Sequence, residues 1–385
     1  MARQGLEPND PPRVLFVSNQ SAFSGAEASL CQLASHIDNA RFSLFAAIGA
    51  EGTFTERLRE ADVRVICPGH GFGSTHIEQA VYLGELISQL KPDVVHLNAL
   101  APPETLFMLL LSGIPLVTHY RVSEIAAFAD QVRASTRVVA VSQFCKSQVV
   151  RAGVHESRVC VIYDEVDTRE FAPAVAHRSE ARREMGVPPD AFVILMVARF
   201  APNKRHDLFL KAVEEARMQI PGLRVILKGE SHGEDSTVLR VRERAATSAL
   251  AGCVEIIPFV DDIRLCYASA DVLVLWSDRE ALGRCVVEGM SMGLPVVVTD
   301  SGGARELVKE GETGFVRPSN DTSGLARLLV ALSRDPAQRE QIGLNARLFA
   351  EANLEASVSA AKMMEVYDSM LAESTARRSS QGLSD

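Results

Sequence analysis

Short, nearly unbroken apolar runs alternate with amphipathic stretches along this chain, and no other feature limits its possible folds so strongly. Each run has the length of a strand, while the stretches between them, such as 26–37 and 77–90, carry apolar residues at helical spacing. Strands that are apolar at successive positions are typical of a parallel sheet covered by helices on both faces. In the first half the expected strands are 13–18, 44–48, 63–67, 93–97, 115–119, 137–141 and 158–162.

The same pattern starts again after a polar stretch over 174–190. In the second half the expected strands are 191–198, 223–228, 254–258, 271–276 and 294–299. A chain of 385 residues is longer than one core usually supports, so two domains are expected. The predicted fold class is therefore α/β, with two facing Rossmann-like domains, parallel sheets, and a ligand cleft between the domains at the carboxyl ends of the strands.

The domain boundaries follow from where this pattern begins and stops. We expect a flexible N-terminus over 1–12, an N-terminal domain over 13–175 and a C-terminal domain over 176–355. A helix over 356–373 is expected to pack back toward the N-terminal domain. Residues 374–385, which are rich in Ser and Arg, are expected to form a disordered tail.

Composition argues against several classes of protein. The formal net charge of −9 leaves no basic excess to neutralise a nucleic-acid strand. The seven cysteines are scattered and form no Cys-x-x-Cys pair, which favours free thiols in a reducing compartment. The N-terminus lacks the apolar core of a signal peptide, and the longest apolar stretch, around 106–111, is too short to cross a bilayer. We therefore expect a cytoplasmic protein with no integral membrane segment.

Two glutamates flank an expected helix start after the strand that ends at Trp276. Glu280 falls in the loop, and Glu288 falls in the second turn of a helix beginning near Leu282. Backbone N–H groups of Leu282 and Gly283 would then lie at a helix N-terminus, which favours a diphosphate. Carboxylates on either side can accept hydrogen bonds from the hydroxyls of a nucleotide sugar. Such spacing also arises by chance, as a solvated loop glutamate followed by one near a helix cap.

Two cations lie on the loop after the strand over 191–198. Arg199 and Lys204 are five residues apart, and a helical pattern follows them. An arginine fork and a mobile lysine can converge on a diphosphate and stabilise the charge that grows as it leaves. The alternative is an ordinary basic loop, which is our interpretation of Arg205.

These residues belong to a longer series of motifs that resembles the family 4 retaining glycosyltransferases, which have the GT-B fold. The resemblance rests on the runs at 280–288, 293–297, 301–306 and 311–316. It implies that Glu280 contacts donor sugar hydroxyls, that Glu288 binds the ribose, and that Arg199 and Lys204 hold the diphosphate. It further implies that the backbone near Val260 contacts the nucleobase.

The chain departs from the family pattern in three places. Glu230 replaces a second glycine after Gly229, and Ser24 replaces the first of two glycines before Gly25. A Tyr163-Asp164-Glu165 run stands where the family often has Asn-Gly, so we interpret this corner as structural.

Two residues of the N-terminal half complete the predicted site. Gly25, at a strand-to-helix turn, allows close approach of the donor phosphates or the acceptor, or else serves helix packing. His119 ends an expected strand, and the resemblance implies that it lies near the donor sugar; the alternative is a core histidine. His96 is a weaker candidate of the same kind.

The predicted function is transfer of a sugar from a UDP- or GDP-sugar to an acceptor hydroxyl, with the retention that the resemblance implies. The acceptor can be a saccharide, a lipid-linked compound or a small molecule. No cofactor is expected, and no metal is expected because no His, Asp and Cys cluster is evident and the cations can take its place. A nucleotide-sugar epimerase and a non-catalytic donor-binding protein remain alternatives. A dehydrogenase is disfavoured because the first turn lacks a G-x-G-x-x-G run.

Overall fold

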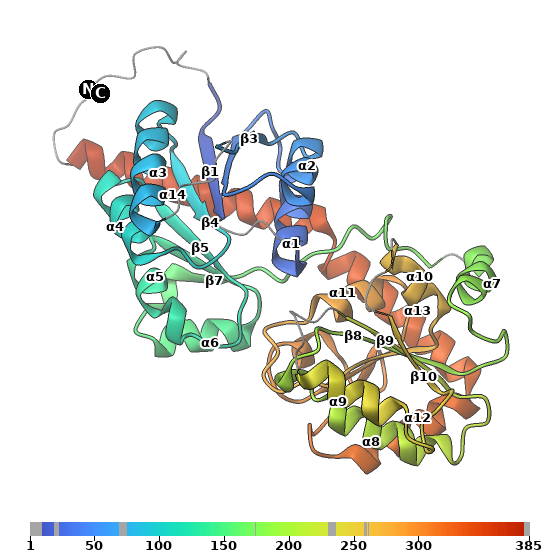
Figure 1. Ribbon diagram of the computed structural model, residues 1–385. Coiled ribbons are helices and arrows are strands. Elements are labelled where there is room, and N and C mark those ends of the chain that lie inside the picture. Colours follow the sequence, from blue (N-terminus) through green and yellow to red (C-terminus); the bar gives the residue numbers. More distant parts are fainter. Residues whose placement is uncertain are drawn as a thin grey trace. The chain divides into compact units, whose positions relative to one another are not determined.

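A computed structural model describes residues 10–18, 23–68, 75–173, 175–229, 236–257, 260 and 262–380. The chain divides into two compact units, each with its own sheet (Figure 1). The first unit holds the chain up to Glu165 and again from Ala356, and the second holds Val166–Glu355. The first change of unit precedes the expected boundary at 175, because the backbone N–H of Val166 donates to the carbonyl of Leu354 (2.9 Å).

Within the described residues, the first unit is built on a seven-stranded parallel sheet in the order β3-β2-β1-β4-β5-β6-β7. Its strands are β1 (Arg13–Ser18), β2 (Ser43–Ile48), β3 (Arg64–Ile66), β4 (Val94–Leu97), β5 (Leu116–Tyr120), β6 (Arg137–Ala140) and β7 (Val159–Val161). Every strand begins and ends within one residue of its predicted bounds. The predicted parallel α/β architecture is confirmed for this unit.

Helices cover both faces of the first sheet. They are α1 (Gly25–Ala34), α2 (Thr53–Glu60), α3 (His76–Leu90), α4 (Pro103–Ser112), α5 (Ala129–Ala134), α6 (Gln143–Arg151), α14 (Ala356–Ser380) and the short turns η1 (Ala126–Phe128) and η2 (Glu156–Arg158). One apolar core lies under α1, α2 and α14, and another lies under α3 and α4. Local sequence sets the helix ends: α4 begins at Pro103 and stops at Gly113, which is left-handed (φ 69°).

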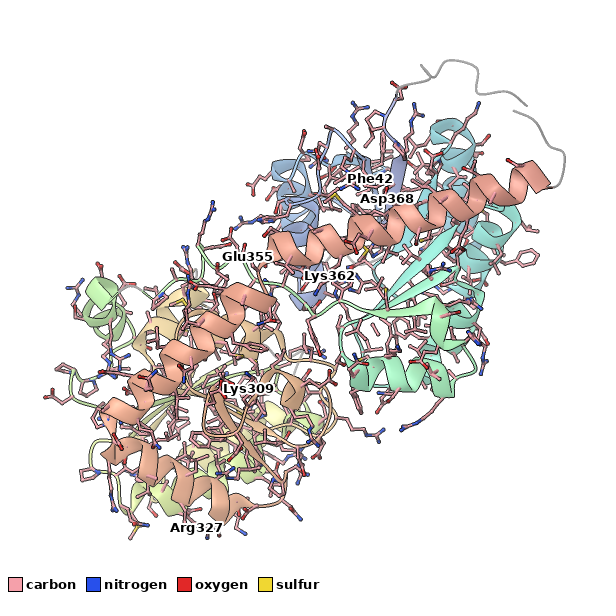
Figure 2. All side chains as sticks on the ribbon, turned by 180° about the vertical axis from the view of Figure 1, so that it is seen from behind. Phe42, Lys309, Arg327, Glu355, Lys362 and Asp368 are labelled. Atoms are coloured by element: carbon pink, nitrogen blue, oxygen red, sulfur yellow. The ribbon has the colours of Figure 1, made fainter. Side chains whose placement is uncertain are left out.

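The helix α14 brings the end of the chain back onto the first unit. Its fully buried residues recur at helical spacing, namely Ala356, Ala360, Met363, Tyr367 and Met370. Figure 2 shows this helix lying along the sheet, with Asp368 near Phe42, and Arg41 Nη2 pairs with the Asp368 carboxylate (2.6 Å). The helix continues to Ser380, past the expected end at 373, because no Pro or Gly interrupts it before Gly382. Residues 381–385 of the expected tail lie outside the described part.

The second unit has its own parallel sheet, six-stranded within the described residues, in the order β10-β9-β8-β11-β12-β13. Its strands are β8 (Val193–Val197), β9 (Arg224–Lys228), β10 (Val254–Ile257), β11 (Val272–Leu275), β12 (Val296–Thr299) and β13 (Gly314–Arg317). The first five were predicted within two residues at each end. The short strand β13 was not, since its residues were interpreted only as part of a family motif.

Helices also cover both faces of the second sheet. They are α7 (Val175–Glu184), α8 (His206–Arg217), α9 (Ser236–Ala245), α10 (Ile263–Ser269), α11 (Arg284–Ser291), α12 (Thr322–Arg334), α13 (Pro336–Asn353), η3 (Pro202–Lys204) and η4 (Ala304–Leu307). The chain's one tryptophan, Trp276, is fully buried in the core beneath α8, α9 and α12. Across the described residues of both units, no helix combines the length and apolar character needed to span a membrane.

Candidate functional site

Two loops of the second unit carry most of the predicted site. The strands β8 and β11 are parallel neighbours, so the loops that leave their carboxyl ends begin side by side. The loop after β8 carries Arg199 and Lys204, and the loop after β11 carries Glu280. A backbone hydrogen bond from Asp278 to the carbonyl of Asn203 (2.8 Å) joins them. The fold thereby brings together residues far apart in sequence.

Lys204 and Glu280 form an ion pair at this junction. The Nζ atom of Lys204 donates to a carboxylate oxygen of Glu280, and Ser277 Oγ donates to the same oxygen at 3.3 Å. Only 13% and 14% of the two side chains is exposed, so their attraction is stronger than at an open surface. A lysine has three N–H groups and a carboxylate has two oxygens, so both can still bind a ligand. The sequence predicted that each residue contacts the nucleotide-sugar donor, but it did not predict that the two form an ion pair.

Arg199 differs from Lys204 in its surroundings. Its side chain is exposed, and no described residue forms an ion pair with it. The turn at Gly229 packs closely on this loop, since a Cβ atom there would lie 2.0 Å from the carbonyl oxygen of Ala198. Glu230, which departs from the family pattern, lies outside the described residues.

A glycine holds the loop that carries Glu280. Gly302 is left-handed (φ 101°), and a Cβ atom on it would lie 2.1 Å from the carbonyl oxygen of Glu280. The next residue, Gly303, donates its backbone N–H to that same oxygen (2.8 Å). The Gly-Gly part of the motif therefore fixes the backbone of Glu280.

Gly283 precedes the first residue of α11, at the expected diphosphate site. Its φ is 90°, and a Cβ atom would lie 2.6 Å from Leu275 Cδ2, so only glycine fits without a shift. Leu282 beside it is buried. The helix α11 begins at Arg284, two residues after the predicted start near Leu282, so its first turn follows directly on the loop that carries Glu280.

Glu288 lies in the second turn of α11 and is held at both carboxylate oxygens. Tyr267 Oη, from α10, donates to Oε2 (2.6 Å), and Arg284 Nε donates to Oε1 (2.7 Å). Tyr267 is fully buried, and burial together with the Glu288 charge raises its pKa well above the usual value. Two of the four lone-pair sites of the carboxylate stay available for a ligand hydroxyl. Sequence reasoning missed Tyr267 because no local motif marks it.

The other predicted residues lie elsewhere. Val260 is half-buried in the loop after β10, where Phe259 and Asp261 lie outside the described residues. Gly25, in the first unit, is the first residue of α1 and is exposed. Among the described residues, no three His, Cys, Asp or Glu side chains gather in a way that could hold a metal ion.

His119 lies in β5 of the first unit and is buried. Burial, followed by the charge of Arg121 and the nearby His96 ring, lowers its pKa well below the usual value. The imidazole is therefore neutral at pH 7 and offers one N–H donor and one acceptor nitrogen. Neither ring nitrogen has a hydrogen-bond partner among the described residues.

Two family models match this chain, one in each unit. The model described as "Glycosyltransferase Family 4" matches residues 23–170, and "Glycosyl transferases group 1" matches residues 177–349. The chain belongs to the family 4 glycosyltransferases. Of the motifs that suggested this family in the sequence, the run at 280–288 carries Glu280 and Glu288, and the run at 301–306 holds the backbone of Glu280.

Solved structures agree on the fold of this family. HepE of Anabaena, in complex with UDP and glucose, superposes with a TM-score of 0.81 at 24% identity, covering 93% of this chain and all of that one. A glycosyltransferase from Rickettsia africae gives a TM-score of 0.82 at 22% identity, over 94% and 99% of the two chains. These likenesses confirm the GT-B fold class.

Curated relatives within the family include D-inositol 3-phosphate glycosyltransferases. Those of Streptomyces bingchenggensis and Catenulispora acidiphila are each 30% identical, over 57% and 65% of this chain and 50% and 60% of their own lengths. The chain thus spans about half the length of the first of these relatives.

Proposed function

We propose that this chain transfers a sugar from a nucleoside-diphosphate sugar to an acceptor hydroxyl, with retention of anomeric configuration. The observation that carries the proposal is the buried Lys204–Glu280 pair at the carboxyl end of the second sheet, one loop away from Glu288. A cation beside a carboxylate suits the point where a diphosphate joins a sugar, because the cation can bind phosphate oxygens and the carboxylate can accept hydrogen bonds from sugar hydroxyls.

Each residue has one role in donor binding. Glu288 accepts hydrogen bonds from the ribose hydroxyls through its remaining lone pairs, while Tyr267 and Arg284 keep it in place. Lys204 donates its remaining N–H groups to the diphosphate. Glu280 keeps one oxygen for a sugar hydroxyl. The exposed Arg199 is free to close on the diphosphate when the donor binds.

In the transfer step, the bond from the anomeric carbon to the phosphate oxygen breaks, and a bond from that carbon to the acceptor oxygen forms on the same face. The departing phosphate oxygen takes the acceptor's proton, so a nucleoside diphosphate leaves. Lys204 and Arg199 stabilise the charge that grows on the phosphate. The neutral His119 is suited to hydrogen-bond a sugar hydroxyl and cannot act as an acid at pH 7.

The relatives support the assignment of a sugar transfer from a nucleotide-sugar donor. They do little to narrow the choice of nucleotide or acceptor. The Anabaena structure holds UDP and glucose, and the curated relatives are named for glycosyl transfer to an inositol phosphate. For this chain the nucleotide is UDP or GDP, and the acceptor is a saccharide, a lipid-linked compound or a small molecule with a free hydroxyl.

Product analysis tests the proposal. The full chain is incubated with a panel of UDP- and GDP-sugars, with and without hydroxyl acceptors, and nucleoside diphosphate release is measured. We expect release that depends on an acceptor and is lost in Lys204→Ala, with the donor's anomeric configuration kept in the product by NMR. Conversion of the sugar without an acceptor would indicate an epimerase, and inversion would contradict the proposed step.

A further inference from the structure

The longest apolar stretch of the sequence, residues 106–111, supplies two apolar faces of one helix. It lies in α4, where Leu106 and Leu109 are buried in the core beneath the helix. Three other side chains of the stretch are exposed: Phe107 (64%), Leu110 (47%) and Leu111 (72%). A helix that only covers a sheet needs one apolar face, so the second face indicates a further contact.

The neighbouring helix α3 extends this exposed surface. In the described part of the chain eleven large hydrophobic side chains are exposed, and five of them lie on these two helices, with Ile77 and Val81 on α3. Figure 1 shows α3 and α4 side by side on the first sheet. Exposed hydrophobic side chains that gather in one place mark an interaction site more often than scattered ones do.

On α3 the exposed hydrophobic side chains lie on the side next to α4. Ile77, Val81 and Gly84 share one stripe because they are four and three residues apart. A Cβ atom on Gly84 would lie 3.5 Å from the Met108 side chain of α4. The same stripe ends at Lys91, the exposed C-cap residue of α3.

On α4 the exposed side chains reach toward α3 in the same way. Glu104, Phe107 and Leu111 share one stripe, three and four residues apart. A carboxylate oxygen of Glu104 lies 3.7 Å from Nδ1 of His76, the first residue of α3. The two stripes therefore adjoin. Their hydrophobic side chains form what we call the α3–α4 patch: Ile77, Val81, Phe107 and Leu111.

The two ends of the α3–α4 patch carry opposite charges. Both helices begin at the same end, as the contact of Glu104 with His76 shows, and Glu104 lies there. Lys91 lies at the other end, where α3 stops. When two copies meet about a two-fold axis with these helices antiparallel, each Glu104 approaches the Lys91 of the other copy. The charges of the patch are therefore complementary to those of a second copy.

The same charges do not suit a lipid surface. Helices that lie on membranes carry Lys and Arg on their polar faces, which anionic lipids attract. Neither α3 nor α4 contains a Lys or an Arg within its bounds. Their exposed acidic residues are Glu78, Glu85 and Glu104, which anionic lipids repel.

We propose that the α3–α4 patch binds a second copy of this chain in a two-fold dimer with antiparallel helices. Each copy then contributes the same hydrophobic side chains and both charges. Contact removes these side chains from water, and Phe107 contributes an aromatic ring of the kind that anchors interfaces. The dimer is independent of the proposed transferase function.

Sedimentation equilibrium of the full chain over a concentration series tests the dimer. We expect a reversible change from the mass of one chain to the mass of two. Phe107→Glu should weaken association at least about tenfold, because it places a carboxylate in the hydrophobic contact. The matched control is Leu344→Glu, which changes a 54% exposed leucine of α13 in the second unit and should associate as the wild type does.

An exchange of charges tests the antiparallel arrangement. Lys91→Glu and Glu104→Lys should each weaken the dimer about three- to tenfold, because the two-fold axis uses each pair twice. The double variant Lys91→Glu, Glu104→Lys restores the attraction and should associate within about twofold of the wild type. Both residues are exposed, so circular dichroism should show all three variants folded.

The mass of one chain at every concentration tested would overturn the proposal. A dimer that Phe107→Glu leaves unchanged, or charge variants that the double change does not restore, would overturn it as well. Flotation with phosphatidylcholine vesicles distinguishes the other occupant. A single-chain mass together with flotation that is lost in Phe107→Glu would assign the α3–α4 patch to lipid instead of a second copy.

Discussion

At the scale of the residue, the donor site depends on side chains that hold other side chains. Glu288 is expected to contact the ribose, but its orientation is set by Tyr267 and Arg284. A carboxylate fixed before the ligand arrives loses less conformational entropy on binding. Tyr267 is therefore a positioning residue that the ligand itself need not touch.

The change Tyr267→Phe tests this role. We expect nucleoside diphosphate affinity to fall about two- to tenfold, the equivalent of one hydrogen bond. Calorimetry measures the affinity, and Tyr367→Phe, which removes a buried hydroxyl of the first unit, is the matched control. Equal affinities in wild type and Tyr267→Phe would show that Glu288 needs no positioning.

At the scale of the element, the loop after β11 takes its shape from its contact with the loop after β12. Gly302 allows that contact because its missing side chain leaves room for the carbonyl of Glu280. The Gly-Gly motif is thus a requirement of backbone packing and has its effect on function through Glu280.

A pair of glycine substitutions separates this contact from backbone strain. Gly302 and Gly311 are both left-handed (φ 101° and 72°), but nothing lies within 4 Å of a Cβ atom at Gly311. Gly311→Ala should cost only the strain, about 1 kcal/mol. Gly302→Ala should cost at least about 2 kcal/mol more and weaken donor binding, because the two loops must separate. Urea unfolding and calorimetry measure both, and similar losses for the two variants would contradict the packing argument.

The elements also show how far sequence reasoning reaches. The predicted strands were close to those observed because a buried parallel strand is a local apolar run. The strand β13 was missed because it starts with Gly314 and its residues were interpreted only as part of a family motif. The pairing of Lys204 with Glu280, and the contact of Tyr367 with His96, join residues 76 and 271 positions apart. Such contacts depend on strand order, which no local pattern contains.

At the scale of the whole molecule, the two units differ in how many neutral histidines they bury among the residues that the structure describes. Burial lowers the pKa of His96 to about 3 and that of His119 well below the usual value, and both belong to the first unit. In the second unit, burial lowers the pKa of His206 to about 4. Unfolding exposes each ring and restores a pKa near 6.5.

Acid should therefore unfold the first unit before the second. Below about pH 6.5 the unfolded chain binds protons that the folded chain does not, so the free energy of unfolding falls as the pH falls toward 4. At pH 5 each buried histidine lowers the free energy of unfolding by about 2 kcal/mol. Two of these histidines lie in the first unit and one lies in the second, so the first unit loses more. Circular dichroism follows both units, while the fluorescence of Trp276 follows the second alone. A fluorescence change that precedes the loss of helix would contradict this order.

The account rests on a donor site in the second unit, and calorimetric titration of the full chain with UDP and GDP tests it most directly. The wild type is compared with Glu288→Ala and with Glu312→Ala, which changes an exposed glutamate of the same unit. We predict that one nucleotide binds preferentially, that Glu288→Ala weakens binding at least about tenfold, and that Glu312→Ala has no effect. Absence of nucleoside diphosphate binding, or binding indifferent to Glu288, would contradict the central claim.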